Sequence, residues 1–236
     1  MFIDASGIVA ANDGYLRGSR WAMENITLGN RATDVLRAAA YLELDTPDDI
    51  TMLRLGIRLI NSAGAGGAAA LSGYYQQAAG HVRDLIEVGF LLDLFRRDPK
   101  QINRWRVCGE KARRNNFSPF EVRKALRKLD GGTAIWDRDA AYELYSKHGT
   151  HISPDDVILM SPNMQTIVGP FADRERLLAV GFDLARYLAA GTGFLMAWLA
   201  TRSPPPNDAM AAYLMAVQAY ERYMHLFRER KTSPKD

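Results

Sequence analysis

The sequence contains a single cysteine, Cys108, among its 236 residues. It can form no disulfide within the chain, so burial of apolar side chains must stabilise the fold. A reducing compartment fits this use of cysteine, and we expect a cytoplasmic protein. The N-terminal residues also lack a basic start to an apolar run and carry Asp4 there instead. The sequence therefore predicts no export signal.

Long uncharged apolar runs are missing too. The most apolar stretch, residues 177–200, contains Asp183 and Arg186, which lie three residues apart and would share one face of a helix. Two charges in so short a span are costly in lipid but are tolerated as a pair inside a protein. We therefore predict a buried bundle helix here, and no membrane partner.

The signatures of several common enzyme sites are absent. The chain has no Gly-x-Ser-x-Gly elbow, no His-Glu-x-x-His and no Glu-x-x-His of the di-iron bundles. Glycines do gather at 62–73, but a phosphate-binding loop needs a strand before it, and the preceding segment is helical in pattern. Segment 62–73 is either a break between helices or a helix with a face of small residues. We expect neither a metal nor a cofactor.

What is present is helical periodicity with recognisable ends, and no sustained alternation of the kind that strands need. Thr46-Pro47 and Ser118-Pro119 are typical helix starts. The sequence therefore predicts an all-α fold, a bundle of about six to eight helices. The expected helical ranges are 31–44, 47–60, 74–98, 99–114, 119–129, 136–148, 173–201 and 208–230, with a short one after Ser153.

The domain organisation follows from the same pattern. Residues 1–30, with glycines at 14, 18 and 29, are expected to be an irregular lead-in, with a short helix as the alternative. Residues 31–203 are expected to form the helical bundle domain. Residues 204–236 combine a proline-rich linker, a C-terminal helix and a frayed tail, which we expect to pack on the same domain.

Three charged residues stand close together among apolar neighbours in the helix predicted over 74–98. Arg83 and Glu87 are spaced i,i+4, and Asp84 lies between them. A charge is seldom placed where it must be desolvated unless it is paired or serves a function. We predict an internal ion pair that fixes the helix register. A polar pocket in the bundle core, able to take a small ligand, is the alternative.

Two histidines flank the end of the helix predicted over 136–148. Histidine can exchange a proton near neutral pH, which suits acid–base catalysis. In a catalytic role, one histidine would be the general acid or base and a nearby cation would stabilise phosphate charge. The alternative is a helix cap and a loop residue. The candidate catalytic residues are His148, His151, Arg83 and Lys147. The residues expected to form a polar core with them are Asp84, Glu87, Tyr142 and Ser146.

Positive charge is concentrated in residues 96–128. This segment has a net charge of +9, which leaves −6 for the rest of a chain whose net charge is +3. Trp105, Phe117 and Phe120 lie among the basic residues, and aromatic rings can stack on bases. An anionic partner is one interpretation, and pairing with acidic helices of the same fold is the other. The candidate nucleic-acid-binding residues are Arg104, Arg106, Arg113, Arg114, Arg123, Lys124, Arg127 and Lys128.

The charged helix, the aromatic residues and the histidines follow one another in an order that is similar to that of a known group of proteins. An apolar helix with Arg83 and Glu87 precedes Asp98-Pro99 and Trp105, and a Tyr-x-x-x-Ser helix end leads to His151. Over roughly residues 50–200 the order resembles that of uncharacterised bacterial helical domains placed near the HEPN superfamily. The resemblance implies an all-helical, usually dimeric protein that binds RNA or cleaves it without a metal, in stress or phage defence.

Whether the chain is an enzyme stays open at this stage. Ribonuclease members of that superfamily carry Arg followed by His four to six residues later, and no Arg precedes His148 or His151 at that spacing. Lys147 stands four residues before His151 in its place. The alternatives are a non-enzymatic interaction or dimerisation protein that uses a small-residue face over 64–73, and a bundle enzyme that uses the Arg83/Glu87 core.

Overall fold

The computed structural model describes residues 4–131, 137–149, 159–161, 165 and 167–232. This described part contains ten α-helices and no strand, which confirms the all-α prediction. The helices are α1 (Ser6–Arg17), α2 (Arg20–Ala39), α3 (Pro47–Leu71), α4 (Tyr75–Arg97), α5 (Lys100–Val107), α6 (Glu110–Asn116), α7 (Pro119–Asp130), α8 (Arg138–Gly149), α9 (Arg174–Leu199) and α10 (Asp208–Thr232).

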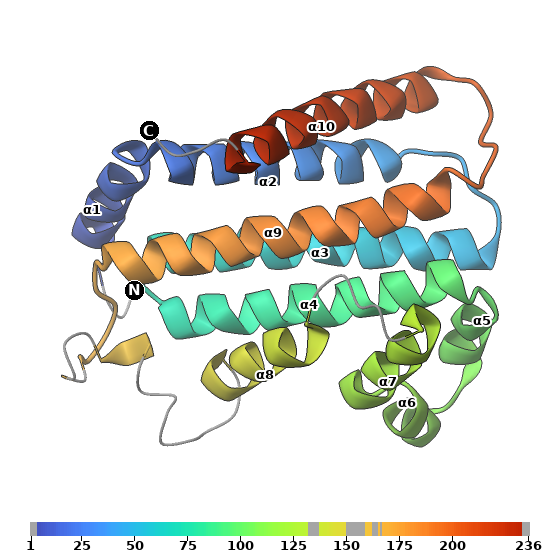
Figure 1. The fold of residues 1–236 in the computed structure, drawn as a ribbon, viewed down its shortest axis with the longest axis horizontal. Helices are drawn as coiled ribbons and strands as arrows, with labels where there is room; N and C mark the ends of the chain where they lie inside the picture. Colours follow the sequence, from blue (N-terminus) through green and yellow to red (C-terminus); the bar gives the residue numbers. More distant parts are fainter. Residues whose placement is uncertain (1–3, 132–136, 150–158, 162–164, 166, 233–236) are drawn as a thin grey trace.

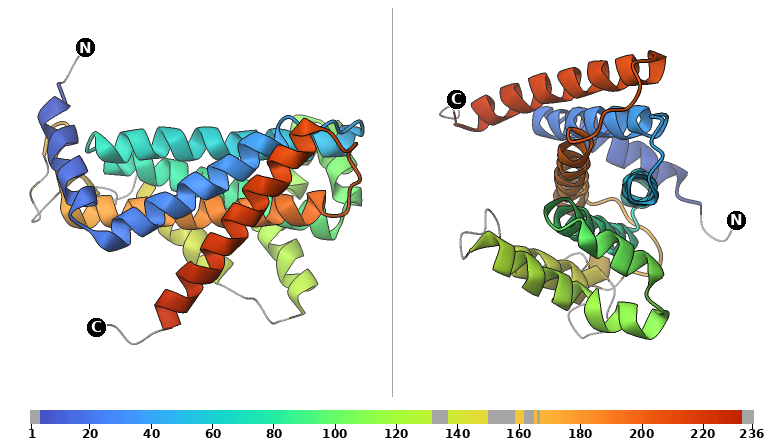
Figure 2. Two further views of the ribbon diagram at one scale, coloured as in Figure 1. Left: turned by 90° about the horizontal axis from the view of Figure 1, so that it is seen from above. Right: turned by 90° about the vertical axis from the view of Figure 1, so that its right-hand side faces the viewer.

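Helix α9 lies at the centre of the bundle, although it comes late in the sequence. It packs against α2, α3 and α4, and α3 packs against α4 (Figure 1). Helix α10 crosses the outer side of α2 obliquely, and α7 and α8 lie on α4 at the opposite side of the molecule (Figure 2). The described helices thus form a long central bundle with one added layer on each side.

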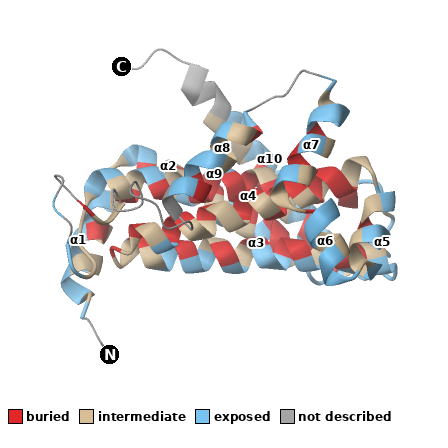
Figure 3. Cartoon of the chain, turned by 90° about the horizontal axis from the view of Figure 1, so that it is seen from below, coloured by how far each residue is buried: buried red, intermediate tan, exposed pale blue. Residues whose placement is uncertain are grey.

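The apolar core follows α4, because this helix is covered on nearly every side. Its side chains Val82, Leu85, Ile86 and Phe90 are almost fully excluded from solvent. Figure 3 shows buried residues along the whole length of α4. Complete burial of such side chains is worth about 1.5–3 kcal/mol each, and it makes α4 the main source of apolar stabilisation.

The segment predicted as an irregular lead-in or a short helix is helical over most of its described length. Helix α1 covers Ser6–Arg17, and α2 begins at Arg20 with Ser19 as its N-cap. The cause is tertiary: the Asn12 side chain is fully buried and donates to the Leu71 carbonyl oxygen (3.0 Å) and the Tyr75 hydroxyl (3.2 Å). Packing of this kind overrides the low helix propensity of glycine.

Residues 62–71 belong to α3, so the interpretation as a helix with small residues is right, and the break between helices is confined to the last residues of the segment. At Gly66 an added Cβ would lie 2.9 Å from the Cβ of His81 and 2.7 Å from a methyl group of Leu184. The missing side chain therefore lets α4 and α9 approach α3 closely. The helix ends at Leu71, and Gly73 two residues later has a φ of 80°, which disfavours other residues.

The number of helices exceeds six to eight for two reasons. The lead-in contributes α1 and most of α2, and the helix predicted over 99–114 is broken at Cys108 and Gly109 into α5 and α6. The predicted starts at Thr46 and Ser118 are confirmed, since each side chain accepts a hydrogen bond from the backbone three residues later. The helix expected after Ser153 lies outside the described residues. Among the helices that the structure describes, none has the length and apolar character needed to span a bilayer.

Candidate functional site

Arg83 and Glu87 form the predicted ion pair. Their side chains meet at 2.9 Å, and the Arg83 guanidinium also donates to the Tyr142 hydroxyl of α8 at 2.9 Å. Both charged side chains are only partly buried, in the seam between α4 and α8 rather than deep in the bundle. Desolvation raises the pKa of the Glu87 carboxyl, and the charge of Arg83 partly offsets this rise.

Asp84 is directed to a different neighbour. Arg58 of α3 donates to both Asp84 carboxylate oxygens through Nε, at 3.1 Å each. Close by, the Ser62 hydroxyl lies 3.2 Å from Nδ1 of His81. The predicted polar core is therefore divided, with Asp84 bound to α3 while Arg83 and Glu87 contact each other and α8.

A second polar contact joins α8 to α9. The Tyr145 hydroxyl donates to the carboxylate of Asp183, and the ring of Tyr187 meets that of Tyr145 edge-on at 6.4 Å. Burial raises the pKa of the Asp183 carboxyl, although the hydrogen bond from Tyr145 opposes this rise. Arg186, the partner expected from the sequence, lies 3.9 Å from Asp183.

Helix α8 thus makes two separate polar contacts, through Tyr142 and through Tyr145, and we call Arg83, Glu87, Tyr142, Tyr145 and Asp183 the α4–α8–α9 polar cluster. A carboxyl group with a raised pKa can hold a proton closer to neutral pH and so serve as a general acid. An arginine nearby can stabilise an anion. Sequence reasoning missed Tyr145 and Asp183. The spacing of Tyr145 three residues after Tyr142 was the available signal, because it places both rings on one face of α8.

The remaining candidate residues lie at or beyond the C-terminal end of α8. Ser146 is buried on α8, and Lys147 is exposed on the same helix. The side chain of His148 and all of His151 lie outside the described residues. The structure therefore brings Arg83, Glu87 and Tyr142 together, and the two histidines remain a sequence-based prediction.

Three of the eight candidate basic residues form close ion pairs within the chain. Arg106 pairs with Asp48 at 2.6 Å, Arg114 pairs with Glu110, and Arg123 is buried against Asp139 at 2.6 Å and the ring of Tyr142. These pairs follow the second interpretation of the charge excess, pairing within the same fold. Only Arg123 is buried, so its pair with Asp139 offsets a cost of desolvation, whereas Arg114 and Glu110 pair at the exposed surface.

Arg104 and Arg113 have neutral partners in the chain. Arg104 lies over the ring of Phe117, and Arg113 donates to the carbonyl oxygen of Cys108 at 3.0 Å and lies over the ring of Trp105. Trp105 and Phe117 themselves pack on Phe95 of α4. These two aromatic rings therefore serve the core and the arginines rather than a partner.

Helix α7 presents a different surface. Phe120 is 55% exposed, and the side chains of Lys124 and Arg127 are 52% and 53% exposed. Residues 120, 124 and 127 are spaced i, i+4, i+7 and share one face of the helix, with the exposed Lys128 beside them. The nearest carboxylates, on Glu121 and Asp139, are 3.6 Å away. We call these four residues the α7 outer face; Figure 2 shows α7 projecting from the bundle.

A buried ionic network attaches this region to α4. Asp93 contacts Arg96 at 2.6 Å and Arg138 at 2.9 Å, and Arg97 contacts Asp130 at 2.7 Å. Asp130 also pairs with Arg138, and the two arginines hold the pKa of the Asp130 carboxyl below its usual range. Asp93 stands three and four residues before Arg96 and Arg97 in an apolar helix, which was a signal that sequence reasoning overlooked. The network holds α7 and α8 in place.

Within the described residues, no group of three or more His, Cys, Asp or Glu side chains is arranged to hold a metal ion. Comparison of the chain with models of protein families, with curated proteins and with solved structures finds no match. A function for the chain therefore has to be inferred from the surfaces and clusters described above.

Proposed function

We propose that the protein binds RNA through the α7 outer face. The observation that carries this proposal is the exposed row of Phe120, Lys124, Arg127 and Lys128 on a projecting helix. Long cationic side chains neutralise phosphates, and an exposed aromatic ring can stack on an unpaired base. Single-stranded RNA offers both features, because its bases are not all hidden in a duplex.

Other parts of the surface support an anionic partner without being part of the proposed contact. Lys100, Arg104 and Lys111 are exposed on α5 and α6, the helices that precede α7. Their charges add to the positive potential on this end of the molecule and would favour the approach of RNA. A HEPN-like role in the cytoplasm, in stress or phage defence, rests on the sequence resemblance alone. Cleavage would further require the α4–α8–α9 polar cluster to reach the bound strand.

The first test removes the cations of the α7 outer face. We expect the triple variant Lys124→Ala/Arg127→Ala/Lys128→Ala to bind fluorescently labelled single-stranded RNA more weakly in anisotropy titrations. Each phosphate contact with a single strand contributes about 0.7 to the slope of log affinity against log salt concentration. Loss of three contacts should therefore reduce that slope by about 2.

A matched control separates a specific surface from net charge. The variant Arg37→Ala/Arg54→Ala/Arg222→Ala removes three exposed cations from α2, α3 and α10, and should leave the salt slope nearly unchanged. Phe120→Ala should weaken binding by about 1–3 kcal/mol through lost stacking, with the slope preserved. Equal effects of the two triple variants would contradict the proposed site.

A further inference from the structure

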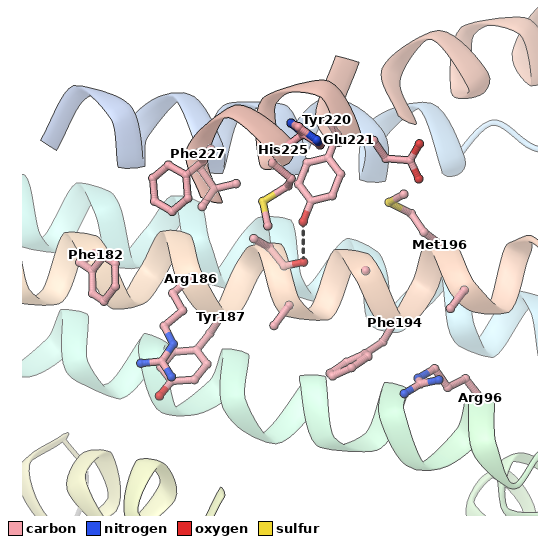
Figure 4. Close-up of a pocket in the computed structure, with 16 residues that line it drawn as sticks. Arg96, Phe182, Arg186, Tyr187, Phe194, Met196, Tyr220, Glu221, His225 and Phe227 are labelled. Carbon is pink, nitrogen blue, oxygen red and sulfur yellow. Dashed lines mark hydrogen bonds between the residues drawn. The ribbon is translucent and has the colours of Figure 1, made fainter. Parts of the chain in front are cut away.

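The fourth side of α9 is left open by the residues that the structure describes. Where α2, α3 and α4 leave this helix uncovered, it forms the floor of a groove of about 1200 Å³. Helix α10 provides one wall, and Arg96 of α4 lies at the opposite wall (Figure 4). The α9 residues that line the groove extend from Phe182 to Ala197, a length of about 22 Å along a helix.

The floor of this groove suits another helix. Ala190, Gly193 and Ala197 recur at helical spacing along the floor, and Phe194 and Phe182 stand beside them. A Cβ added to Gly193 would meet no atom within 4 Å, so packing inside the chain does not require this glycine. Small residues let two helix axes approach to about 8–10 Å. Pockets for small molecules are typically about 300–1,000 Å³, so an open groove of this volume fits a helix better.

The groove carries both signs of charge. Arg186 is 48% exposed on the floor helix, and Glu221 is exposed on the α10 wall. Arg96 contributes little net charge, because it pairs with the buried Asp93 at 2.6 Å. In Figure 4, Arg186 extends toward α4 whereas Glu221 comes from α10. A patch that holds opposite charges on its two sides is complementary to itself when it is turned by a twofold axis.

Helix α10 also offers the apolar surface that such a groove would take. Leu214, Met215 and Leu226 are 49%, 71% and 45% exposed on this helix, whose other face packs on α2. Large apolar side chains that stay exposed next to an apolar groove are typical of a protein–protein contact. The described part of the chain thus contains both a helix with an uncovered apolar side and a groove in which no helix lies.

We propose that the occupant of the groove is a second copy of this chain. In the dimer, α10 of each copy lies along α9 of the other, and Glu221 of one copy faces Arg186 of the other. This interface lies on α9 and α10 and uses none of the four residues of the α7 outer face. The proposal goes beyond RNA binding and does not depend on it.

The oligomeric state of the full chain tests the proposal, measured by analytical ultracentrifugation over a range of protein concentrations. The wild-type protein should be a dimer. Gly193→Leu should be a folded monomer, because its Cβ meets no atom within 4 Å and the rest of the side chain would extend into the groove. The matched control is Gly64→Leu, which changes the same residue type where a Cβ also meets nothing, on the exposed side of α3. It should remain a dimer.

A charge exchange tests the register of the two copies. Arg186→Glu and Glu221→Arg should each weaken the dimer by about tenfold or more, because like charges then face each other twice. When the two single variants are mixed, each contact again joins opposite charges, and a heterodimer should form with an affinity close to that of the wild type. Circular dichroism checks that both variants are folded.

Three results would overturn the proposal. The first is a wild-type chain that stays monomeric at every concentration. The second is dissociation by Gly64→Leu but not by Gly193→Leu, which would place the interface on the small-residue face of α3. The third is a mixture of the two charge variants that recovers no dimer. RNA titrations of the same variants remain interpretable, since none of them alters α7.

Discussion

At the scale of single residues, Asp93 is the clearest case of a charge that the fold must satisfy. Its side chain is 1% exposed, and three arginines lie within 4 Å of its carboxylate. We expect Asp93→Ala to lower the free energy of unfolding by about 3–5 kcal/mol, because the nearly buried Arg138 would keep its charge and lose a partner. Urea denaturation measures this loss.

The control for this substitution is Asp34→Ala. Asp34 pairs with Arg31 at 3.6 Å, and both side chains are about half exposed. Exposed pairs of this kind contribute about 0–1 kcal/mol. A loss at Asp93 no larger than the loss at Asp34 would show that the network does not carry the stability assigned to it.

Asp183 gives the molecule a dependence on pH. Burial raises the pKa of its carboxyl above the ordinary 3.8, so the folded state binds this proton more tightly than the unfolded state does. The stabilisation that this tighter proton binding gives the folded state is fully present below the ordinary pKa. It is lost as pH rises through the folded-state pKa. Asp183→Asn cannot ionise, yet its amide oxygen can still accept the Tyr145 hydrogen bond. Its stability relative to the wild type should therefore increase as pH rises toward neutrality.

Urea denaturation at a series of pH values measures this difference. Tyr145→Phe provides an independent check, because it removes the hydrogen bond that opposes the rise in the pKa of Asp183. In that variant the loss of stability with increasing pH should be larger than in the wild type. If the difference between Asp183→Asn and wild type did not change with pH, the carboxyl would not be titrating as proposed.

At the scale of helices, two glycines of α3 should respond in opposite directions to the same substitution. Gly66→Ala should destabilise the fold by about 1–3 kcal/mol, because the new Cβ would lie 2.9 Å from the Cβ of His81, which sits next to backbone and cannot move away. Gly64→Ala meets no atom within 4 Å and should stabilise the helix by about 0.5–1 kcal/mol. Thermal or urea unfolding measures the change in the free energy of unfolding for both variants. If both substitutions stabilised the fold, or both destabilised it, the close packing at Gly66 would be refuted.

The ends of the helices were the most predictable part of the fold, because they depend on local chemistry. Thr46 and Ser118 cap helices through their own hydroxyl groups, and Gly131 ends α7 with a φ of 59°. Helix α1 was not predictable in this way. Its buried Asn12 bonds to Tyr75, which is 63 residues away in the sequence, and no local pattern reports a contact at that separation.

At the scale of the whole molecule, the candidate site was partly predictable for the same reason. Arg83 and Glu87 are one turn apart, so their pairing followed from spacing alone. Asp183 reaches the cluster only because α8 lies against the bundle, and its partner Tyr145 is 38 residues away. Likewise, the count of basic residues gave the excess charge of segment 96–128. It could not show that Arg106 would be paired with Asp48, which is 58 residues earlier.

The central position of α9 has a consequence for how the chain is made. Helices α2, α3 and α4 emerge from the ribosome first, yet each of them packs on α9, and Asp49 of α3 accepts a hydrogen bond from the Trp198 indole at 2.8 Å. These early helices must wait, with apolar faces uncovered, until residues 174–199 have been synthesised. The nascent chain is therefore most exposed to aggregation and to chaperones during translation of the segment between α4 and α9.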